Sequence, residues 1–312
     1  MAHFGLTRRS ALIGSLAMPF IRPALADPVL RVGDQKGGNK SLMQAAGVLD
    51  GLESRIEWNT FAAAAPLLEA LNAGAIDCGG VGDAPFAFAR AAGVKAKVIL
   101  STRSAGASTA LLVPEGSAAR SFSDLKGRTI GTGKGSVGHY LAVAARDRAG
   151  LSPEDIKLAF LNPADAKAAS VSGSIDAWST WGPYVYLAVV QNKARILLDG
   201  SNGLMSGLSY FVASEKAITE KRDVLTLFKQ RLAKALDWGL ANTDAYAAAW
   251  AEETGVPVEV SRLTLQARGF KPVPIDAGVI ADQQRTVDLY AKERVLPMRY
   301  DAASGFDASF NG

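Results

Sequence analysis

Short apolar runs alternate along the chain with longer stretches in which apolar residues recur every three or four positions. The short runs predict buried strands, and the longer pattern predicts amphipathic helices. We expect strands at residues 29–33, 55–61, 77–81, 98–101, 109–113, 128–131, 157–161, 175–179, 196–199 and 208–213. We expect helices at residues 41–50, 66–73, 83–92, 136–148, 163–171 and 182–191. This alternation predicts an α/β fold of mainly parallel sheets flanked by helices.

The pattern changes after Ser214, where apolar residues keep a helical spacing and no strand is expected. Four helices are predicted there, at residues 222–242, 243–253, 258–268 and 276–293. We expect them to pack on the first of two lobes. That lobe would comprise residues 27–113 and 207–312. The second lobe, residues 114–206, would be inserted between crossover segments near Pro114 and Leu204.

A weak internal repeat supports two similar lobes. The pattern Gly-x-x-Lys-Gly begins at Gly33 and again at Gly131, about 98 positions later. The pattern Gly-x-Ile-Asp begins at Gly74 and again at Gly173, at nearly the same offset. Two pairs of patterns at one offset indicate two copies of a single α/β unit. Two such lobes predict a shared cleft that binds something small.

Composition and charge narrow the class of protein. Hydrophobic residues make up 48% and charged residues 21% of 312 residues, which is typical of a globular chain of two domains. The formal net charge is +4, but Arg8, Arg9 and Arg22 lie in a segment that we expect to be removed. Taking these three from 34 basic residues leaves 31 against 30 acidic ones. The sequence therefore predicts no nucleic-acid binding, which requires a clustered basic face.

The first 26 residues are typical of an export signal. Thr7-Arg8-Arg9-Ser10 precedes an apolar run over residues 11–21, and Ala24-Leu25-Ala26 forms a small-x-small cleavage site. The paired arginines indicate the twin-arginine route. A membrane anchor is the alternative, but the run is shorter than the ~20 residues that span a bilayer. We expect cleavage near Ala26 and a soluble periplasmic protein that begins at Asp27.

Six short motifs occur in order along the mature chain. They are Leu71-Asn72-Ala73-Gly74-Ala75-Ile76-Asp77, Val81-Gly82-Asp83-Ala84-Pro85, Asp124-Leu125-Lys126-Gly127, Lys134-Gly135-Ser136-x-x-His139, Pro163-Ala164-Asp165-Ala166, and Asp176-Ala177-Trp178 with Trp181-x-Pro183-Tyr184. Because all six motifs occur in this order, the mature chain resembles the periplasmic substrate-binding proteins of ABC importers for aliphatic sulfonates.

The resemblance implies a two-lobed, type II-like periplasmic binding-protein fold that closes around its solute. It implies a monomer that delivers a small anionic sulfonate to an ABC permease in the inner membrane. Taurine, nitrate and thiamin precursors remain open as solutes, because relatives take them. The family often has an aromatic residue where Asp34 stands and an acidic one where Gly182 stands. A carboxylate at Asp34 would oppose an anionic head group unless it points away.

Two strand-to-helix turns are the candidate anion sites. Gly82 and Asp83 begin one helix, and Ser136, Val137 and Gly138 begin the matching helix of the second lobe. The first backbone N–H groups of a helix lack partners inside it and carry the positive end of its dipole, so they can hold a sulfonate oxygen. The alternative for Asp83 is that it only caps its helix.

Other candidates line the expected cleft. By the family pattern Gln35 supplies a neutral donor, and Ser108 and Thr109 could donate hydroxyls from a crossover strand. Trp178 and Trp181 could wall the organic part of the solute, although either could pack in a core. His139, one turn inside its helix, is a further candidate contact, with packing as its alternative.

Other classes of function fit less well. Gly133-x-Gly135-x-x-Gly138 matches a dinucleotide fingerprint, but Asn162 stands where an acidic residue is expected. Some desulfinases resemble these binding proteins and use a cysteine nucleophile. The single cysteine, Cys78, falls in a short apolar strand. One histidine and one cysteine in the mature chain make a poor metal site. We therefore expect no catalysis, no metal and no cofactor.

Overall fold

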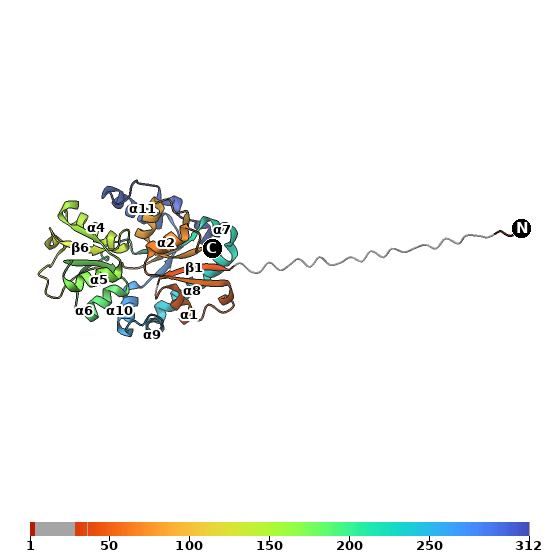
Figure 1. The fold of residues 1–312 in the computed structure, drawn as a ribbon, viewed down its shortest axis with the longest axis horizontal. Coiled ribbons are helices and arrows are strands. Elements are labelled where there is room, and N and C mark those ends of the chain that lie inside the picture. The colour runs from red at the N-terminus through yellow and green to blue at the C-terminus, as the bar shows by residue number, and fades with distance from the viewer. Residues whose placement is uncertain (4–28, 36, 312) are drawn as a thin grey trace.

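The computed structural model describes residues 1–3, 29–35 and 37–311. Within this part of the chain, the strands form one six-stranded and one five-stranded sheet, both flanked by helices. Figure 1 shows the elements of the five-stranded sheet at one end of the molecule and those of the six-stranded sheet at the other. The expected export signal falls almost wholly on residues 4–28, outside the described residues.

The six-stranded sheet has the order β11-β4-β10-β3-β1-β2. Its strands are β1 (Leu30–Gln35), β2 (Ile56–Phe61), β3 (Cys78–Gly82), β4 (Ala96–Arg103), β10 (Leu208–Ser214) and β11 (Lys271–Val273). The helices along this part of the chain are α1 (Asn39–Ala45), α2 (Ala64–Asn72), α3 (Asp83–Ala91), α7 (Glu215–Glu220), α8 (Arg222–Ala241), α9 (Thr243–Thr254), α10 (Val258–Arg268) and α11 (Ala277–Lys292). The expectation of no strand after Ser214 was wrong, because β11 pairs with the edge of β4.

The five-stranded sheet has the order β7-β6-β8-β5-β9. Its strands are β5 (Thr109–Val113), β6 (Thr129–Thr132), β7 (Lys157–Phe160), β8 (Ala177–Trp181) and β9 (Arg195–Asp199), with helices α4 (Val137–Arg148), α5 (Pro163–Ser172) and α6 (Pro183–Asn192). The expected first lobe included residues 109–113, but β5 pairs with β8 and β9 of this sheet. The chain therefore crosses from one sheet to the other before Thr109.

Both sheets are mixed: most strands of each run in one direction, as expected, with β10 and β11 reversed in one sheet and β5 in the other. Strands within each βαβ run are parallel, as β1 is to β2 and β3, and β6 is to β7 and β8. Strand β10 runs antiparallel to β3 and β4, and β5 runs antiparallel to β8 and β9. These two strands enter their sheets from the other sheet rather than through a βαβ crossover, so the rule that makes such crossovers parallel does not govern them. The α/β class is confirmed.

Helix caps follow from the local sequence. The Asn162 side chain accepts hydrogen bonds from the amides of Ala164 and Asp165 at the start of α5, and Pro163 follows at the first helical position. Gly182 precedes α6 with φ +51° and ψ −131°, a conformation that side-chain-bearing residues rarely adopt. No neighbouring atom lies within 4 Å of where its Cβ would stand, so backbone conformation alone favours glycine there.

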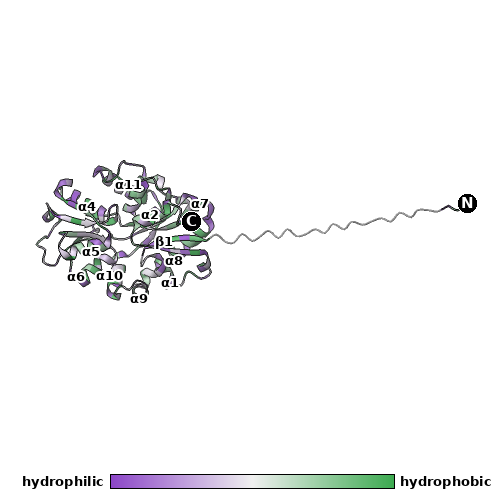
Figure 2. Ribbon diagram, in the orientation of Figure 1, coloured by the Kyte–Doolittle hydropathy of each residue, from purple (hydrophilic) through white to green (hydrophobic). Residues whose placement is uncertain are grey.

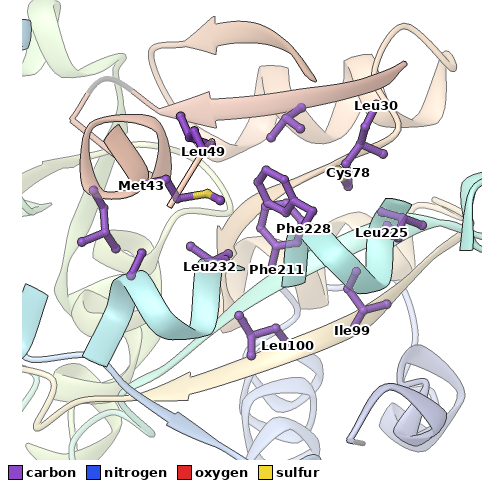
Figure 3. Close-up of a cluster of buried hydrophobic side chains, with 14 of the residues drawn as sticks. Leu30, Met43, Leu49, Cys78, Ile99, Leu100, Phe211, Leu225, Phe228 and Leu232 are labelled. Atoms are coloured by element: carbon purple, nitrogen blue, oxygen red, sulfur yellow. The ribbon is translucent and has the colours of Figure 1, made fainter. Parts of the chain in front are cut away.

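The largest core cluster packs α8 on the six-stranded sheet. Figure 3 shows Leu225, Phe228 and Leu232 pointing from α8 toward Ile99, Leu100 and Phe211 on the strands. The rings of Phe211 and Phe228 stack with centroids 5.0 Å apart. In Figure 2 the helices alternate between hydrophobic and hydrophilic residues, as expected for helices that cover a sheet with one face. Among residues 29–35 and 37–311, no helix has both the length and the apolar character needed to cross a bilayer.

Candidate functional site

A cavity of about 800 Å³ lies between the two sheets. Its walls come from the carboxyl ends of β1 and β3, the starts of α3 and α4, strand β8 with helix α6, and helices α8 to α10. The volume lies within the range of small-molecule sites. Of the predicted site residues, the cavity is lined by Gln35, Gly82, Asp83, Ser108, Thr109, Ser136, Val137 and Trp181.

Helix α3 begins at the edge of the cavity with Gly82 as its N-cap and Asp83 as its first residue. The alternative that Asp83 is the N-cap was therefore wrong by one position. Its buried carboxylate accepts bonds from the Ser206 hydroxyl at 2.5 Å and from the Ala84 amide at 2.7 Å. Burial raises the pKa of this carboxyl. The Asp83 carboxylate is thus hydrogen-bonded to Ser206 and to the start of α3, and is not a free group in the cavity.

Helix α4 begins on the other wall with Ser136 as its N-cap. The Ser136 hydroxyl oxygen accepts a hydrogen bond from the His139 amide at 3.1 Å. A hydroxyl that accepts from the backbone still has its proton to donate. Ser136 and Val137 therefore offer the cavity a hydroxyl donor together with the positive end of a twelve-residue helix.

The two helix starts, although they belong to different sheets, lie side by side. A Cβ on Gly82 would stand 2.6 Å from Cγ1 of Val137, and one on Gly135 would stand 2.8 Å from Cγ of Phe88 in α3. Glycine at these positions permits this approach, and Gly135 also has φ +69°. The structure thus places backbone donors from both halves of the chain at one point of the cavity.

His139 and Gly138, predicted as ligand contacts, do not line the cavity. The His139 ring is buried, packs on Phe160 and Tyr290, and accepts the Gly135 amide at Nδ1. Burial lowers its pKa to about 4, so the ring is neutral. A Cβ on Gly138 would lie 2.5 Å from the Ser179 carbonyl oxygen. Both residues therefore shape the turn before α4 rather than face a solute.

The two predicted tryptophans on β8 lie on opposite faces of the sheet. Positions 178 and 181 differ by an odd number, so a strand points them to opposite faces. Trp178 is buried with Ala110 and Leu112 in a core cluster, so its prediction as a wall of the cleft was wrong. Trp181 lines the cavity, with its ring 5.9 Å from that of Tyr184 in an edge-on arrangement.

The polar candidates from β1 and β5 lie on the cavity wall. The Gln35 amide donates to the Gly80 carbonyl at 3.3 Å. The Ser108 carbonyl accepts from the Gly182 amide at 2.8 Å, which fixes the entry into β5 next to the start of α6. Thr109 follows as the first residue of β5 and is largely buried.

Asp34 does not aim at the helix starts of α3 and α4. Its carboxylate oxygens accept bonds from the Asn39 amide at 2.9 Å and the Lys40 amide at 2.8 Å, which caps α1. Burial raises the pKa of Asp34 to about 6, against the lowering effect of these bonds. Because the Asp34 carboxylate is hydrogen-bonded to backbone amides, it should repel an anion in the cavity less than its position in the sequence suggested.

Several lining residues escaped prediction from the sequence. They are polar residues near strand ends, aromatic residues of the second half, and one face of the helices after Ser214, namely Asn39, Thr102, Ser104, Ser209, Phe160, Tyr184, Leu236, Leu240, Trp250 and Arg268. The helices were expected to pack on the first lobe, and α10 also packs on α6. The helical spacing of Leu232, Leu236 and Leu240 was the available signal.

Groups for nucleophilic or metal chemistry are poorly placed. Cys78 lies fully buried in β3, and burial raises the pKa of its thiol well above the ordinary value. A thiol in this state behaves as a small apolar side chain. Among residues 29–35 and 37–311, no three metal-ligating side chains gather in one place.

Comparison with known proteins agrees with this architecture. The profile of the NMT1/THI5-like family matches residues 55–245. A protein of Escherichia coli named as an aliphatic sulfonates-binding protein is 36% identical over 300 residues, covering 93% of each chain. The solved alkanesulfonate-binding protein SsuA from Xanthomonas axonopodis pv. citri, bound to MOPS, is 35% identical with a TM-score of 0.83, covering 90% of this chain and 99% of that one.

A second solved structure gives the same result. The periplasmic aliphatic sulphonate binding protein SsuA of Escherichia coli is 33% identical with a TM-score of 0.78, and the match covers 90% of this chain and 92% of that one. The chain therefore belongs to the NMT1/THI5-like family, together with these sulfonate-binding proteins.

Proposed function

We propose that this protein binds an aliphatic sulfonate in the cavity between its two sheets and delivers it to an ABC permease. The observation that carries the proposal is the meeting of the α3 and α4 starts at one point of the cavity. Backbone amides and a hydroxyl suit a sulfonate, which offers three acceptor oxygens and a single negative charge. The names of the relatives support the same solute class.

The binding cycle follows from the placement of these donors. One set belongs to the half of the chain that holds β3, and the other to the half that holds β6. A solute that contacts both sets favours the arrangement in which they adjoin, because only that arrangement makes both sets of contacts. The two halves, divided near residues 104–108 and 200–207, would act as lobes that close on the solute.

We also propose how this protein reaches its place of action in the cell. The protein would be exported by the segment over residues 1–26, cleaved near Ala26, and act as a monomer in the periplasm. It would be a carrier and not an enzyme, in keeping with the buried thiol of Cys78. Taurine is the second candidate solute, because a taurine-binding periplasmic protein of Escherichia coli is 25% identical over 75% of this chain.

A thermal-shift and calorimetric screen of the mature chain tests the proposal. Alkanesulfonates at 100 times their dissociation constant should add about 2.7 kcal/mol to the free energy of unfolding. Taurine, nitrate, sulfate and thiamin precursors form the comparison set. Stabilisation by a heterocycle alone would contradict the sulfonate proposal while leaving the fold unaffected.

Ser136→Asp is the decisive variant. Aspartate caps a helix as well as serine does, so the fold should persist. Its carboxylate would stand where the sulfonate binds, and like-charge repulsion should abolish binding in calorimetry. Ser123→Asp, on an exposed residue of a short 3-10 helix, is the control and should bind normally. Unchanged affinity in Ser136→Asp would remove this helix start from the site.

A further inference from the structure

The Asp83 carboxylate, at the start of α3, is hydrogen-bonded to a residue that lies between the two sheets. It is almost fully buried, and its oxygens accept the Ala84 amide at 2.7 Å and the Thr286 hydroxyl at 3.4 Å. Its shortest bond, at 2.5 Å, comes from the Ser206 hydroxyl. A hydrogen bond to a carboxylate is stronger than one between neutral groups, and the low dielectric around a buried group strengthens it further.

Ser206 lies in the second of the two chain segments that join the sheets, between β9 and β10. Its hydroxyl oxygen also accepts the Leu208 amide at 3.0 Å, and its carbonyl accepts the Arg103 guanidinium at 2.9 Å. Arg103 is the last residue of β4, directly before the first joining segment, and it also pairs with Asp282 of α11 at 2.5 Å. Ser206 is therefore held from α3, β4 and β10 at once.

The two joining segments, residues 104–108 and 200–207, lie against each other, and we call them the hinge pair. The Ser104 amide donates to the Gly207 carbonyl at 2.9 Å. A Cβ on Gly207 would stand 2.1 Å from the Ser104 carbonyl oxygen, so glycine permits this close approach. Within residues 37–311, the chain passes between the sheets only in these two segments. A rotation of one half against the other must therefore occur within the hinge pair.

We infer that Ser206 is a positioning residue for solute binding. Its bond to Asp83 ties the hinge pair to the start of α3, so the two halves keep the orientation in which the α3 and α4 starts adjoin. The inference rests on the proposed function and identifies a residue that sets this orientation. Without the bond, the hinge pair should allow other orientations, in which a sulfonate meets only one helix start. The apparent affinity falls with the fraction of protein in the binding orientation, and we expect a loss of about tenfold.

Ser206→Ala removes the hydroxyl and tests this inference. Dyes attached at Lys157→Cys in β7 and Lys216→Cys in α7, both exposed, report the distance between the halves by single-molecule FRET. The native Cys78 is buried and should not react with the dyes. Without solute, the alanine variant should show a broader distance distribution than the wild type. Saturating hexanesulfonate should restore the wild-type distribution, and calorimetry should give about tenfold weaker binding.

Two further variants separate the role of this hydroxyl from a general loss of stability. Ser206→Thr keeps the hydroxyl, so it should keep the wild-type distance distribution and affinity. Thr286→Val removes a different hydroxyl from the same Asp83 carboxylate and leaves the hinge pair unchanged. This matched control should unfold at a lower urea concentration and show the wild-type distance distribution.

An unbroadened distribution in Ser206→Ala would overturn the inference, and so would equal broadening in Ser206→Ala and Thr286→Val. Equal losses of affinity in the alanine and threonine variants would also overturn it, because the hydroxyl would then not be responsible. The distance measurement without solute is independent of which solute binds. Failure of every sulfonate to bind the wild-type protein would therefore overturn the proposed function separately from the link between Ser206 and the hinge pair.

Discussion

Gly138 illustrates how one residue near the site serves the fold and not the solute. Its carbonyl accepts the Ser179 hydroxyl at 2.7 Å, and its missing side chain lets α4 lie against β8. We predict that Gly138→Ala costs about 1–3 kcal/mol, because the new methyl group would meet a backbone oxygen at 2.5 Å. Denaturant unfolding measures this cost.

Gly133→Ala is the matched control for Gly138→Ala. The nearest atoms to its Cβ, in Ser136, lie at 3.5 Å, which is ordinary contact. This control should unfold close to the wild-type midpoint. Equal midpoints for the Gly133 and Gly138 variants would show that the α4–β8 approach tolerates a side chain.

His139 makes the stability of the protein depend on pH. Its folded-state pKa of about 4 lies below the unfolded value of about 6.5, because burial disfavours the charged ring. The native state therefore binds the proton less readily than the unfolded state. The stability that this difference provides is complete above pH 6.5 and is lost as the pH falls toward 4. Between pH 7 and pH 5 the loss should be about 2 kcal/mol.

His139→Asn tests this assignment, since the asparagine oxygen can still accept the Gly135 amide. The variant should lose about 2 kcal/mol less than wild type between pH 7 and pH 5, as measured by urea unfolding at both values. Asp34 acts in the opposite sense between pH 4 and 6, because burial raises its pKa to about 6. Both proteins contain it, so it cancels in the comparison. Parallel pH profiles would contradict the assignment.

The sequence predicted site residues best where a rule of backbone chemistry applied. Ser136 and Gly82 were identified because strand-to-helix turns expose amides, and both line the cavity. Trp178 was misassigned although the alternation of a strand separates it from Trp181. The position of Asp34 could not be predicted, because its partners are amides five and six residues along a turn.

At the scale of elements, α11 supports both helix starts from behind the cavity. Its Gln283 donates to the Asp83 carbonyl at 3.1 Å, and its Tyr290 hydroxyl donates to the Ser136 carbonyl at 3.1 Å. Both side chains are buried. One helix thus positions groups from both sheets, although neither side chain lines the cavity.

Tyr290→Phe should therefore weaken binding without removing a solute contact. Loss of the hydroxyl should cost about 1 kcal/mol of stability, and the less restrained Ser136 should bind a sulfonate up to about fivefold more weakly. Tyr300→Phe is the control, because its hydroxyl donates to the Ala87 carbonyl farther along α3. It should lose stability and keep its affinity. Equal affinities in the two variants would show that α11 has no positioning role.

Element types were predicted well, and their pairing was not. The βαβ alternation predicted the strands and helices of both sheets up to β10. Strands β5 and β10 were expected at these residues, but the sheet that β5 joins and the antiparallel pairing of both depend on how the chain passes between the sheets, which local patterns do not encode. Helices α8 to α10 were predicted, but their part in the cavity wall depends on tertiary packing such as that of α6 on α10.

In the whole molecule, an apolar cluster spans the two sheets on the side away from the α6–α10 contact. It joins Ala84 and Ala87 of α3 to Leu141 of α4 and Val287 of α11. The α6–α10 contact closes the other side. A solute between these two sides touches both halves of the chain, which is the arrangement that the proposed closing on a sulfonate requires.

A crystal structure of the mature protein with hexanesulfonate would show where a sulfonate head group binds. We predict that the sulfonate oxygens bind the amides of Asp83 and Val137 and the Ser136 hydroxyl. Arg268 lines the same cavity and is the alternative anion anchor. A sulfonate bound to the Arg268 guanidinium, with water at the starts of α3 and α4, would show that the helix starts are not the anion site.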